Sequence, residues 1–481
     1  MRETYTGFRR RLTGTTALTV LAAGALVLSG GYAGAVTLND GETLIAATDG
    51  DIGPAGEIVT FIGGSYNAST NVGASSILQI TGTFSTSRTL NFTNFGGRIE
   101  TDTGTTLTAT GLITGGNFIK QGAGTLVITG DGTGFIGTTR VYGGTLRIEG
   151  GGDLGSTNAA GGAIGNGANV VVTGAGSTWT TYGQIGVGKI GSGTMTISAG
   201  GKVFSGNAGS GGTTGGIIGE SGDSAVTITG AGSEWATDKA NLYVGHFNDG
   251  ELTLTDSGTL RVGVSGTGMV TAGITGAGII NIGAMEGDPA AIAGTLQAAS
   301  VNLAVADSKM VFNHTSAGYT FATPVSGIGT IRQIAGTTVL SAVNTYTGGT
   351  VVMGGVLRAG VDGAFVDNSG YTVNGGALDL NSFNLTMSSL TGTGGKVTVG
   401  TAELTINQTT NTTYAGQLEG SGDIIKSGAG ALLLTGDSST TFTGTTTVSG
   451  GGLFVGNLSG GKLGGDITVE TGGRRGGIGN I

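Results

Sequence analysis

The sequence KQGAGTLVITGD at residues 120–131 returns as KSGAGALLLTGD at residues 426–437. In both copies apolar residues alternate with other side chains after a glycine-rich turn, which predicts a short strand with one buried face. A second apolar segment follows each copy, at residues 141–148 and 448–455, and a more diverged copy occupies residues 335–357. One such unit cannot bury its apolar face alone, so the repetition predicts a solenoid whose successive coils share a core.

A second kind of repeat lies between these units. VTGAGSTW at residues 172–179 recurs as ITGAGSEW at residues 228–235, so the two tryptophans of the chain, Trp179 and Trp235, hold equivalent positions in the two copies. This spacing predicts three coils of roughly 19 residues each. Each tryptophan is interpreted either as an aromatic packed inside its coil or as a surface-contact residue on which a sugar ring stacks.

The composition excludes other fold classes. Of the 481 residues 104 are glycine, 3 are proline, none is cysteine and 11% are charged. Each interior glycine costs a helix about 1 kcal/mol, and a hydrophobic fraction of 37% argues against disorder. The sequence therefore predicts an all-β fold, a parallel β-helix or β-solenoid with coils about 4.8 Å apart.

In this β-helix, side chains alternate between core and surface, and glycines at the corners provide positive φ. At roughly 20 residues per coil, the chain after residue 35 predicts about 22 coils and a rod approaching 100 Å. The expected inward residues are Leu126, Ile128, Leu432 and Leu434. The equivalent corner glycines are Gly130 and Gly436 in one kind of repeat, and Gly174 and Gly230 in the other.

The N-terminal segment has the organisation of a secretory signal peptide. Basic residues 9–11 precede an apolar run at residues 17–28, and an A-x-A sequence ends at Ala35, so cleavage is predicted before Val36. The apolar run is shorter than the roughly 20 residues that a membrane-spanning helix needs. The sequence therefore predicts export through the inner membrane.

The units at residues 120–148 and 426–455 resemble the passenger-associated strand repeats of bacterial autotransporters, the type V secretion adhesins. The GAGSTW and GAGSEW units are similar to a second repeat class of such passengers. The resemblance implies a right-handed parallel β-helical passenger of a Gram-negative cell, located at the cell surface or outer membrane or secreted. It also implies a role in adhesion, aggregation or virulence.

The expected organisation is a signal peptide at residues 1–35, a β-helix start or cap at 36–110 and a repetitive passenger at 111–481. Its repeats are expected near residues 111–150, 164–204, 218–262, 326–360 and 418–457. The resemblance also implies a C-terminal membrane β-barrel, whereas the sequence up to residue 481 still looks like repeat. We therefore expect a passenger truncated before any barrel, with outer-membrane contact only through a barrel absent from this chain.

The sequence predicts no catalytic residue, no cofactor and no metal site. The glycine-rich residues 183–190 resemble a phosphate-binding loop, but Ile190 occupies the position of the magnesium-binding hydroxyl residue. Asp49 and Asp51 form a close carboxylate pair, yet two ligands do not make a calcium site.

Recurrent polar residues are interpreted as structural. Asp131 and Asp437 occupy equivalent corners, which indicates a turn role in which the carboxylate accepts backbone amides. Lys120 and Lys426 precede equivalent strands and are expected to be solvated strand ends. His246 lies in the turn after a repeat strand.

The net charge and the lack of predicted catalytic residues favour a structural and interaction role. A net charge of −9 argues against nucleic acid as a partner. The predicted function is that of an exported surface passenger that acts as an adhesin or by homotypic self-association, with an unidentified host or surface protein or glycan as ligand. One alternative is a β-helical carbohydrate-active enzyme, which a groove with at least three converging charged residues would favour. Another is a truncated remnant without a function of its own.

Overall fold

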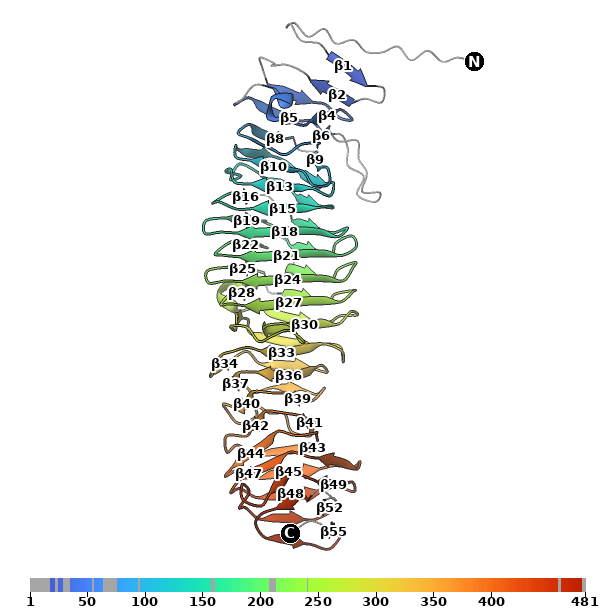
Figure 1. Ribbon diagram of the computed structural model, residues 1–481, viewed down its shortest axis with the longest axis vertical. Helices are drawn as coiled ribbons and strands as arrows, with labels where there is room; N and C mark the ends of the chain where they lie inside the picture. Colours follow the sequence, from blue (N-terminus) through green and yellow to red (C-terminus); the bar gives the residue numbers. More distant parts are fainter. Residues whose placement is uncertain are drawn as a thin grey trace, which may run out of the picture.

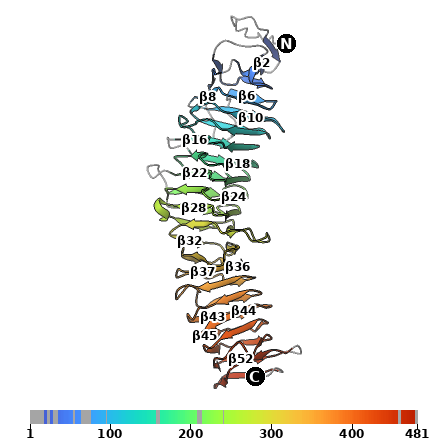
Figure 2. The same ribbon diagram turned by 60° about the vertical axis from the view of Figure 1, so that its left-hand side comes forward.

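The computed structural model describes residues 18–21, 25–28, 35–53, 56–63, 76–93, 96–156, 161–206, 213–239, 241–456 and 460–477. The protein is a rod of stacked coils that follow one another in sequence order from one end to the other (Figures 1 and 2). Apart from two short 3-10 helices, η1 (Asp49–Ile52) and η2 (Val264–Gly266), the elements of the described residues are strands. Within those residues no helix has the length and apolar character needed to cross a bilayer.

The strands stack into two long ladders and several shorter ones, and they pair in parallel apart from an N-terminal hairpin. Ladder 1 consists of β7 (Phe84–Thr86), β10 (Thr106–Ala109), β13 (Thr125–Ile128), β15 (Thr145–Ile148), β18 (Ala168–Thr173), β21 (Gly193–Ser198), β24 (Ser224–Thr229), β27 (Gly250–Thr255), β30 (Gly278–Gly283), β33 (Lys309–Asn313), β36 (Thr330–Ala335), β39 (Thr350–Val352), β41 (Ser369–Val373), β43 (Leu385–Thr391), β45 (Leu404–Asn407), β48 (Ile424–Ser427), β51 (Thr446–Val448) and β54 (Ile467–Val469).

Ladder 2 consists of β1 (Leu18–Leu21), β2 (Ala25–Leu28), β4 (Thr43–Ala46), β6 (Ser76–Ile80), β9 (Gly97–Thr101), β12 (Phe118–Gln121), β14 (Thr139–Val141), β17 (Gly162–Ile164), β20 (Ile185–Val187), β23 (Thr214–Ile218), β26 (Asn241–Val244), β29 (Met269–Ala272), β32 (Ser300–Leu303), β35 (Val325–Gly327) and β38 (Thr345–Tyr346).

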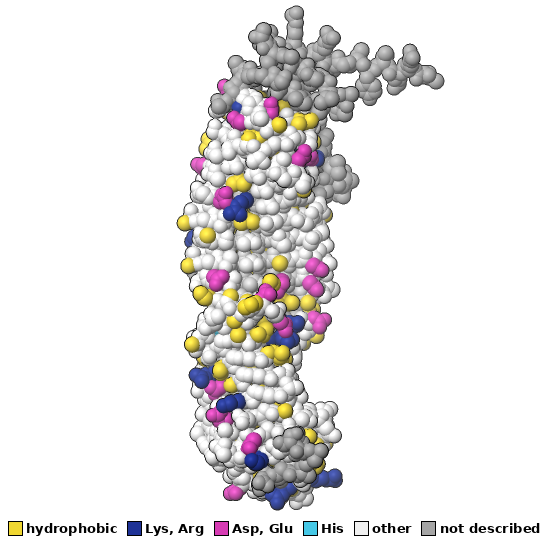
Figure 3. Space-filling view, in the orientation of Figure 1, with side chains coloured by type: hydrophobic (Ala, Val, Ile, Leu, Met, Phe, Trp, Pro, Cys, Tyr) yellow, Lys and Arg dark blue, Asp and Glu magenta, His cyan; other side chains and the backbone are white. Residues whose placement is uncertain are grey.

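The shorter ladders complete the coils. They are β3 (Val36–Leu38), β5 (Ile58–Phe61), β8 (Thr89–Phe92) and β11 (Ile113–Gly115); β16 (Asp153–Gly155), β19 (Thr178–Thr180), β22 (Lys202–Ser205), β25 (Glu234–Thr237), β28 (Thr259–Val262) and β31 (Thr295–Gln297); β34 (Tyr319–Phe321), β37 (Thr337–Leu340), β40 (Val356–Ala359), β42 (Ala377–Asp379), β44 (Lys396–Gly400) and β47 (Gln417–Gly420); β46 (Thr412–Tyr414), β49 (Ala431–Leu434), β52 (Gly451–Val455) and β55 (Gly473–Gly476); and β50 (Asp437–Ser438) with β53 (Lys462–Leu463). Figure 3 shows that charged and hydrophobic side chains cover little of the face in view.

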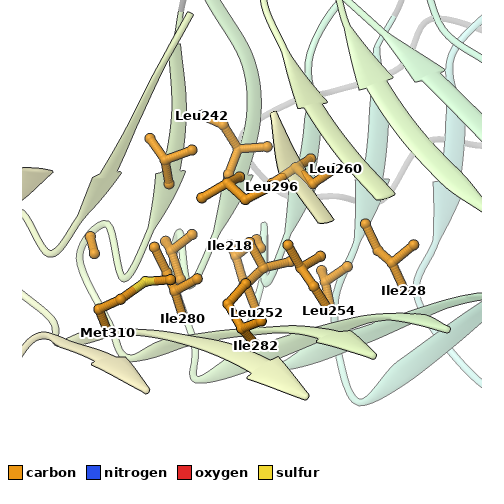
Figure 4. Packing of buried hydrophobic residues seen from close by; sticks show 14 of the residues in the cluster. Ile218, Ile228, Leu242, Leu252, Leu254, Leu260, Ile280, Ile282, Leu296 and Met310 are labelled. Carbon is orange, nitrogen blue, oxygen red and sulfur yellow. The ribbon is translucent and has the colours of Figure 1, made fainter. Parts of the chain in front are cut away.

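The core runs along the whole rod because neighbouring coils pair in register. In ladder 1 Ile228 pairs with Leu254, which pairs with Ile282, and all three are fully buried. Figure 4 shows how such apolar side chains from successive coils pack between the ladders. The predicted inward residues Leu126, Ile128, Leu432 and Leu434 all lie in this core. The prediction of an all-β solenoid is therefore confirmed.

The number of coils is smaller than predicted. Ladder 1 contains 18 coils and begins at Phe84, after two coils that contain β4 and β6, whereas the sequence predicted about 22 for the chain after residue 35. Near the C-terminal end Leu404 pairs with Ile424, but in the middle of the chain Thr194 pairs with Ala225, a longer step along the sequence. The prediction assumed uniform coils, and the central coils use more residues per turn. At about 4.8 Å per coil, ladder 1 extends over about 80 Å.

The two tryptophans are two coils apart rather than three. Trp179 pairs with Val203, and Val203 pairs with Trp235. Both steps along the sequence are longer than the repeat predicted from the tryptophan spacing, so that repeat length is wrong in this part of the chain.

The predicted signal segment is described only in part. β1 and β2 pair antiparallel, β2 pairs with β4, and the other residues before Ala35 lie outside the described residues. Val36 begins β3, which pairs in parallel with β5. Cleavage between Ala35 and Val36 stays a prediction.

Glycine serves two different purposes at the corners. Gly174 and Gly230 have φ of +90° and +89°, as predicted. Gly130 and Gly436 have no positive φ, and a Cβ there would lie 1.9 and 2.1 Å from a carbonyl oxygen of the neighbouring coil. At these two corners the close approach of coils, rather than the backbone angle, requires glycine.

Lys120 and Lys426 are fully buried, so the expectation of solvated strand ends is wrong. Lys120 Nζ donates to the carbonyl oxygens of Gln121, Gly122 and Gly143 at 2.7, 3.0 and 3.1 Å. The corresponding acceptors of Lys426 are the carbonyl oxygens of Ser427, Gly428 and Gly450. Each ammonium thus ties its own turn to the next coil, at a corner where carbonyl oxygens converge.

Burial lowers the pKa of Lys120 to about 8, against the opposing charge of Glu100, and it also lowers the pKa of Lys426. In the diverged repeat Gln333 lies near the end of the strand before the glycine turn, as Lys426 does, and its Nε2 donates to the carbonyl oxygens of Ala335 and Gly336 at 2.7 and 3.2 Å. All three positions therefore hold a long side chain whose N–H group reaches the carbonyl oxygens of the turn.

We expect Gly130→Ala and Gly436→Ala each to lower the free energy of unfolding by about 1–3 kcal/mol, the usual cost of overpacking. The new methyl group would meet the carbonyl oxygen of the preceding coil. Denaturant unfolding followed by circular dichroism measures the change. The control Gly318→Ala, where a Cβ meets nothing within 4 Å, should leave stability unchanged. Equal losses in all three variants would contradict the steric explanation.

Replacing Lys120 or Lys426 by methionine should lower the free energy of unfolding by about 1–3 kcal/mol, because buried carbonyl oxygens lose their donor. The matched control is Lys462→Met, whose partly exposed ammonium pairs with Asp437 at 3.0 Å and should contribute little. Thermal unfolding of the three variants tests this. Unchanged stability in the two buried-lysine variants would show that the carbonyl oxygens find other donors.

Candidate functional site

Most of the lysine and arginine side chains in the described coils form ion pairs. Ion pairs join adjacent coils, as Lys202 does with Glu234 and Arg358 with Asp379. Among the described lysines and arginines, only the neighbours at 474–475 have side chains without an ion pair or hydrogen bond. The negative charge of the surface therefore comes from carboxylates that have no cationic neighbour.

A groove of about 410 Å³ crosses ladder 1 where β18, β21, β24 and β27 begin. Its lining includes the small residues Ala168, Gly193, Ser224, Ala225 and Gly250. Because these strand starts carry little or no side chain, successive coils leave a hollow between the corner and the middle of the ladder.

Three carboxylates line this groove. Asp223 Oδ1 accepts the backbone N–H of Asp249 at 3.2 Å, and Asp249 Oδ1 accepts the N–H of Ala277 at 2.8 Å. Glu251 Oε1 accepts an N–H of the Asn281 amide at 2.8 Å. Within the described part of the chain none of the three forms an ion pair. Each carboxyl group thus has a second oxygen that can bond to an external group.

The groove only partly meets the expectation set for a carbohydrate-active enzyme. Three carboxylates do converge, but a glycoside hydrolase also needs a carboxyl group that an apolar pocket keeps protonated. Asp223 and Asp249 are exposed, and neither lysine nor arginine lines the groove. Over the described ranges no three His, Asp or Glu side chains are placed to share a metal ion. The three carboxylates make the groove attractive to cations.

Residues 284–294, between β30 and β31, form a loop that we call the central loop. Asn313 Nδ2 donates to the carbonyl oxygens of Met285 and Asp288, both at 2.9 Å. Tyr319 donates from its hydroxyl to a carbonyl oxygen at the end of the loop at 3.0 Å. These bonds from the coil beneath fix the loop to the solenoid.

The central loop exposes two large apolar side chains. Met285 is 40% exposed and Ile292 is 54% exposed. Glu286 forms ion pairs with Lys309 and Arg332 of ladder 1 at 3.5 and 2.7 Å, so the loop lies against that ladder. Hydrophobic side chains gather among charged ones at the height of β27 to β33 (Figure 3). The loop therefore exposes apolar side chains near the middle of the rod.

His314 lies fully buried beside the central loop, where it forms a parallel bridge with Ala291. Its Nε2 is 2.8 Å from Thr338 Oγ1, and its ring centroid is 5.2 Å from that of Tyr319. Burial lowers the pKa of His314, against a hydrogen bond to the backbone of Ser316 that raises it. Burial therefore favours the neutral imidazole, and the residue supports the loop through its bridge to Ala291.

Trp179 and Trp235 do not reach the surface, since both are fully buried. Each indole packs against a glycine of ladder 2, Gly162 or Gly216, where a Cβ would lie 2.6 or 2.5 Å from the ring. Trp235 Nε1 donates to Ser205 Oγ at 2.9 Å. The interpretation as surface-contact residues is therefore wrong, because glycine on the facing strand makes room for the ring inside the coil.

Asp131 and Asp437 have the turn role that was predicted. Asp131 Oδ1 accepts the N–H of Thr133 at 2.8 Å, and Asp437 Oδ1 accepts the hydroxyl and N–H of Ser439 at 2.6 and 3.1 Å. The Thr133 N–H lowers the pKa of Asp131, and the Ser439 donors lower the pKa of Asp437 to about 2.

The other polar residues considered from the sequence also have structural partners. Asp51 Oδ2 accepts the N–H groups before η1, and Asp49 pairs with the buried Arg88. Lys189, in the glycine-rich stretch that resembles a phosphate-binding loop, pairs with Glu220. His246 lies at the corner between β26 and β27, as expected.

The groove and the central loop were not predicted from the sequence. The groove depends on which small residues stack on one another, and coil lengths that vary along the chain hide that register. The loop did carry a signal: Asp288–Pro289 is a turn-forming pair in a chain with three prolines. It interrupts the strand-and-glycine pattern and marks an insertion.

Comparison with known proteins identifies the class of this solenoid. The passenger-associated-transport-repeat family model matches residues 118–148, 335–359 and 424–453, the same three units that the sequence shows to be related. A stretch of 97 residues is 44% identical to the adhesin BmaC autotransporter of Brucella suis biovar 1 and covers 20% of this chain and 3% of that protein. A stretch of 190 residues is 34% identical to the uncharacterized lipoprotein YdeK of Escherichia coli and covers 35% of this chain and 14% of that protein.

The chain thus spans a small part of the curated relatives that it matches. Its fold and repeats define a β-solenoid passenger. More specifically, it carries the passenger-associated repeats of autotransporter passengers, and the family resemblance seen in the sequence is confirmed.

We expect Asn313→Ala to release the central loop, because two loop carbonyl oxygens lose their donor. Amide hydrogen exchange at residues 284–294 should become at least tenfold faster, while exchange in β27 stays unchanged. Asn302→Ala, on ladder 2, is the control. Unchanged exchange in the Asn313 variant would show that the remaining contacts hold the loop by themselves.

Proposed function

We propose that the protein is an exported cell-surface adhesin in which the solenoid is a stiff stalk and the central loop contacts the ligand. The observation that carries this proposal is the loop itself. It is fixed by Asn313 and Tyr319 and presents the exposed apolar side chains Met285 and Ile292. Exposed apolar groups on a rigid support are typical of binding surfaces, and insertions in solenoids often form the binding face.

Two relatives support the surface location. The Brucella suis protein is named an adhesin and an autotransporter, and the Escherichia coli protein is named a lipoprotein. The predicted signal peptide agrees with export, and the cell envelope or the medium of a Gram-negative bacterium is the proposed location.

We further propose that the protein acts by binding and catalyses no reaction. Neither relative carries the name of an enzyme. A second molecule of the same chain is a less suitable ligand than a different molecule, because a net charge of −9 on each copy opposes association. The ligand is therefore a host or surface protein or glycan.

Display of the full chain on a non-adherent bacterium, through an unrelated outer-membrane anchor, tests the adhesin proposal. Displaying cells should attach to host cells or matrix more than cells that carry the anchor alone. The double variant Met285→Ser/Ile292→Ser should attach about tenfold less well, since the loss of buried apolar anchors costs about 1–2 kcal/mol.

The matched control is Ile62→Ser/Val469→Ser, which makes comparable chemical changes at exposed positions outside the central loop. Antibody binding confirms equal display. Attachment no better than that of the anchor alone would remove the adhesin proposal. Equal losses in the two double variants would remove the central loop as its site.

A further inference from the structure

Exposed carboxylates recur at one corner of the coil, where strands of ladder 1 begin. One or two residues before seven of these strands stand Asp223, Asp249, Asp307, Asp367, Glu403, Asp423 and Asp466. All seven are exposed, and none forms an ion pair within the part of the chain that the structure describes. No lysine or arginine stands at the equivalent positions of the other ladder 1 strands. This corner is therefore negative along much of the rod.

The stacking of coils explains why carboxylates recur there. Asp223, Asp249 and Asp423 each accept a backbone N–H of the next coil, the last from Thr445 at 3.1 Å. That bond uses one carboxylate oxygen. The second oxygen and the negative charge remain available to the solvent and to a partner.

The groove across ladder 1 lies beside some of these carboxylates. Small side chains such as Ala225 form part of its lining, and Asp223, Asp249 and Glu251 contribute carboxylates. Asp223 and Asp249 hold equivalent positions of adjacent coils, about 4.8 Å apart, and Glu251 lies two residues beyond Asp249, about 6.6 Å away. Lysine and arginine have a complementary form, an apolar stem that packs on small side chains and a cationic end that reaches a carboxylate.

We propose that this groove docks an extended lysine- or arginine-rich segment of another protein. The inference rests on the proposed adhesive function and names the class of its partner. In an extended segment, side chains on one face lie about 6.6–7 Å apart. The long, flexible side chain of lysine lets the ammonium groups adjust to the spacing of the three carboxylates.

Charge also selects against other occupants. A second copy of the chain offers only Arg474 and Arg475 as unpaired cations within its described residues. Anionic polymers such as nucleic acids are repelled by the corner. A cationic partner is attracted at long range, and its association depends on ionic strength within the Debye length of about 8 Å at physiological salt.

The test uses the purified full chain and fluorescent twelve-residue peptides of alternating lysine and threonine, or of glutamate and threonine. Fluorescence polarisation should show that the lysine peptide binds and the glutamate peptide does not. Binding should weaken at least tenfold between low and physiological salt. The variant Asp223→Asn/Asp249→Asn/Glu251→Gln should weaken binding at least tenfold, because the amides retain the hydrogen-bond acceptors but lose the charge.

The control variant Asp307→Asn/Glu403→Gln/Asp423→Asn removes three charges from the same corner outside the groove, and it should change the affinity less than threefold. Circular dichroism shows whether both variants keep the solenoid. Equal weakening in the two variants would overturn the groove as the site. Binding would then depend only on the overall negative charge of the corner. No salt-dependent binding of the lysine peptide to the natural chain would also overturn the proposal.

Two further outcomes identify a different occupant and would overturn the assignment to a peptide. One is tighter binding of a glucosamine oligomer than of the lysine peptide, lost in the groove variant. The other is a salt-sensitive dimer that Arg474→Gln/Arg475→Gln abolishes. Peptide binding without cell attachment of the displayed chain would contradict the adhesin proposal and keep the groove. Cell attachment with no peptide binding would contradict the groove as a peptide site and keep the adhesin proposal.

Discussion

The structure depends on one constraint, the parallel, in-register stacking of coils about 4.8 Å apart. Every side chain then lies above and below the side chain at the same position of the neighbouring coils, so apolar columns such as Ile228, Leu254 and Ile282 form a continuous core. The same closeness makes carbonyl oxygens converge at corners. Glycine is required where a Cβ would collide with these carbonyl oxygens, as at Gly130. At other corners a buried side chain such as Lys120 donates hydrogen bonds to them.

Stacking also explains how the proposed recognition surface arises. Carboxylates that secure the next coil, such as Asp223 and Asp249, repeat along one corner and sum to a negative edge. Small residues that repeat at strand starts open a groove beside that edge. The central loop is a departure from the repeat, held by Asn313, and it exposes the apolar side chains of Met285 and Ile292.

Much of the fold was predictable, and the errors share one cause. The inward positions of Leu126 and Leu432 follow from alternation over a short stretch of chain, and the structure confirms them. The predicted number of coils and the three-coil spacing of the tryptophans were wrong, because they required the length of each turn. Loops of different length between strands leave the local pattern unchanged but alter which residues meet, as the pairing of Trp179 with Val203 illustrates.

The sequence by itself determined the class of the protein: an all-β repeat array with passenger-associated repeats, few charges and no cysteine. It also determined the turn roles of Asp131 and Asp437, which depend on bonds to residues two positions away. Only the tertiary structure decided that Trp179, Trp235, Lys120 and Lys426 are buried, and that Asp223, Asp249 and Glu251 share a groove. The reason is that burial and convergence depend on the neighbouring coil, which is a full turn of the solenoid away along the chain and at a distance that varies from coil to coil.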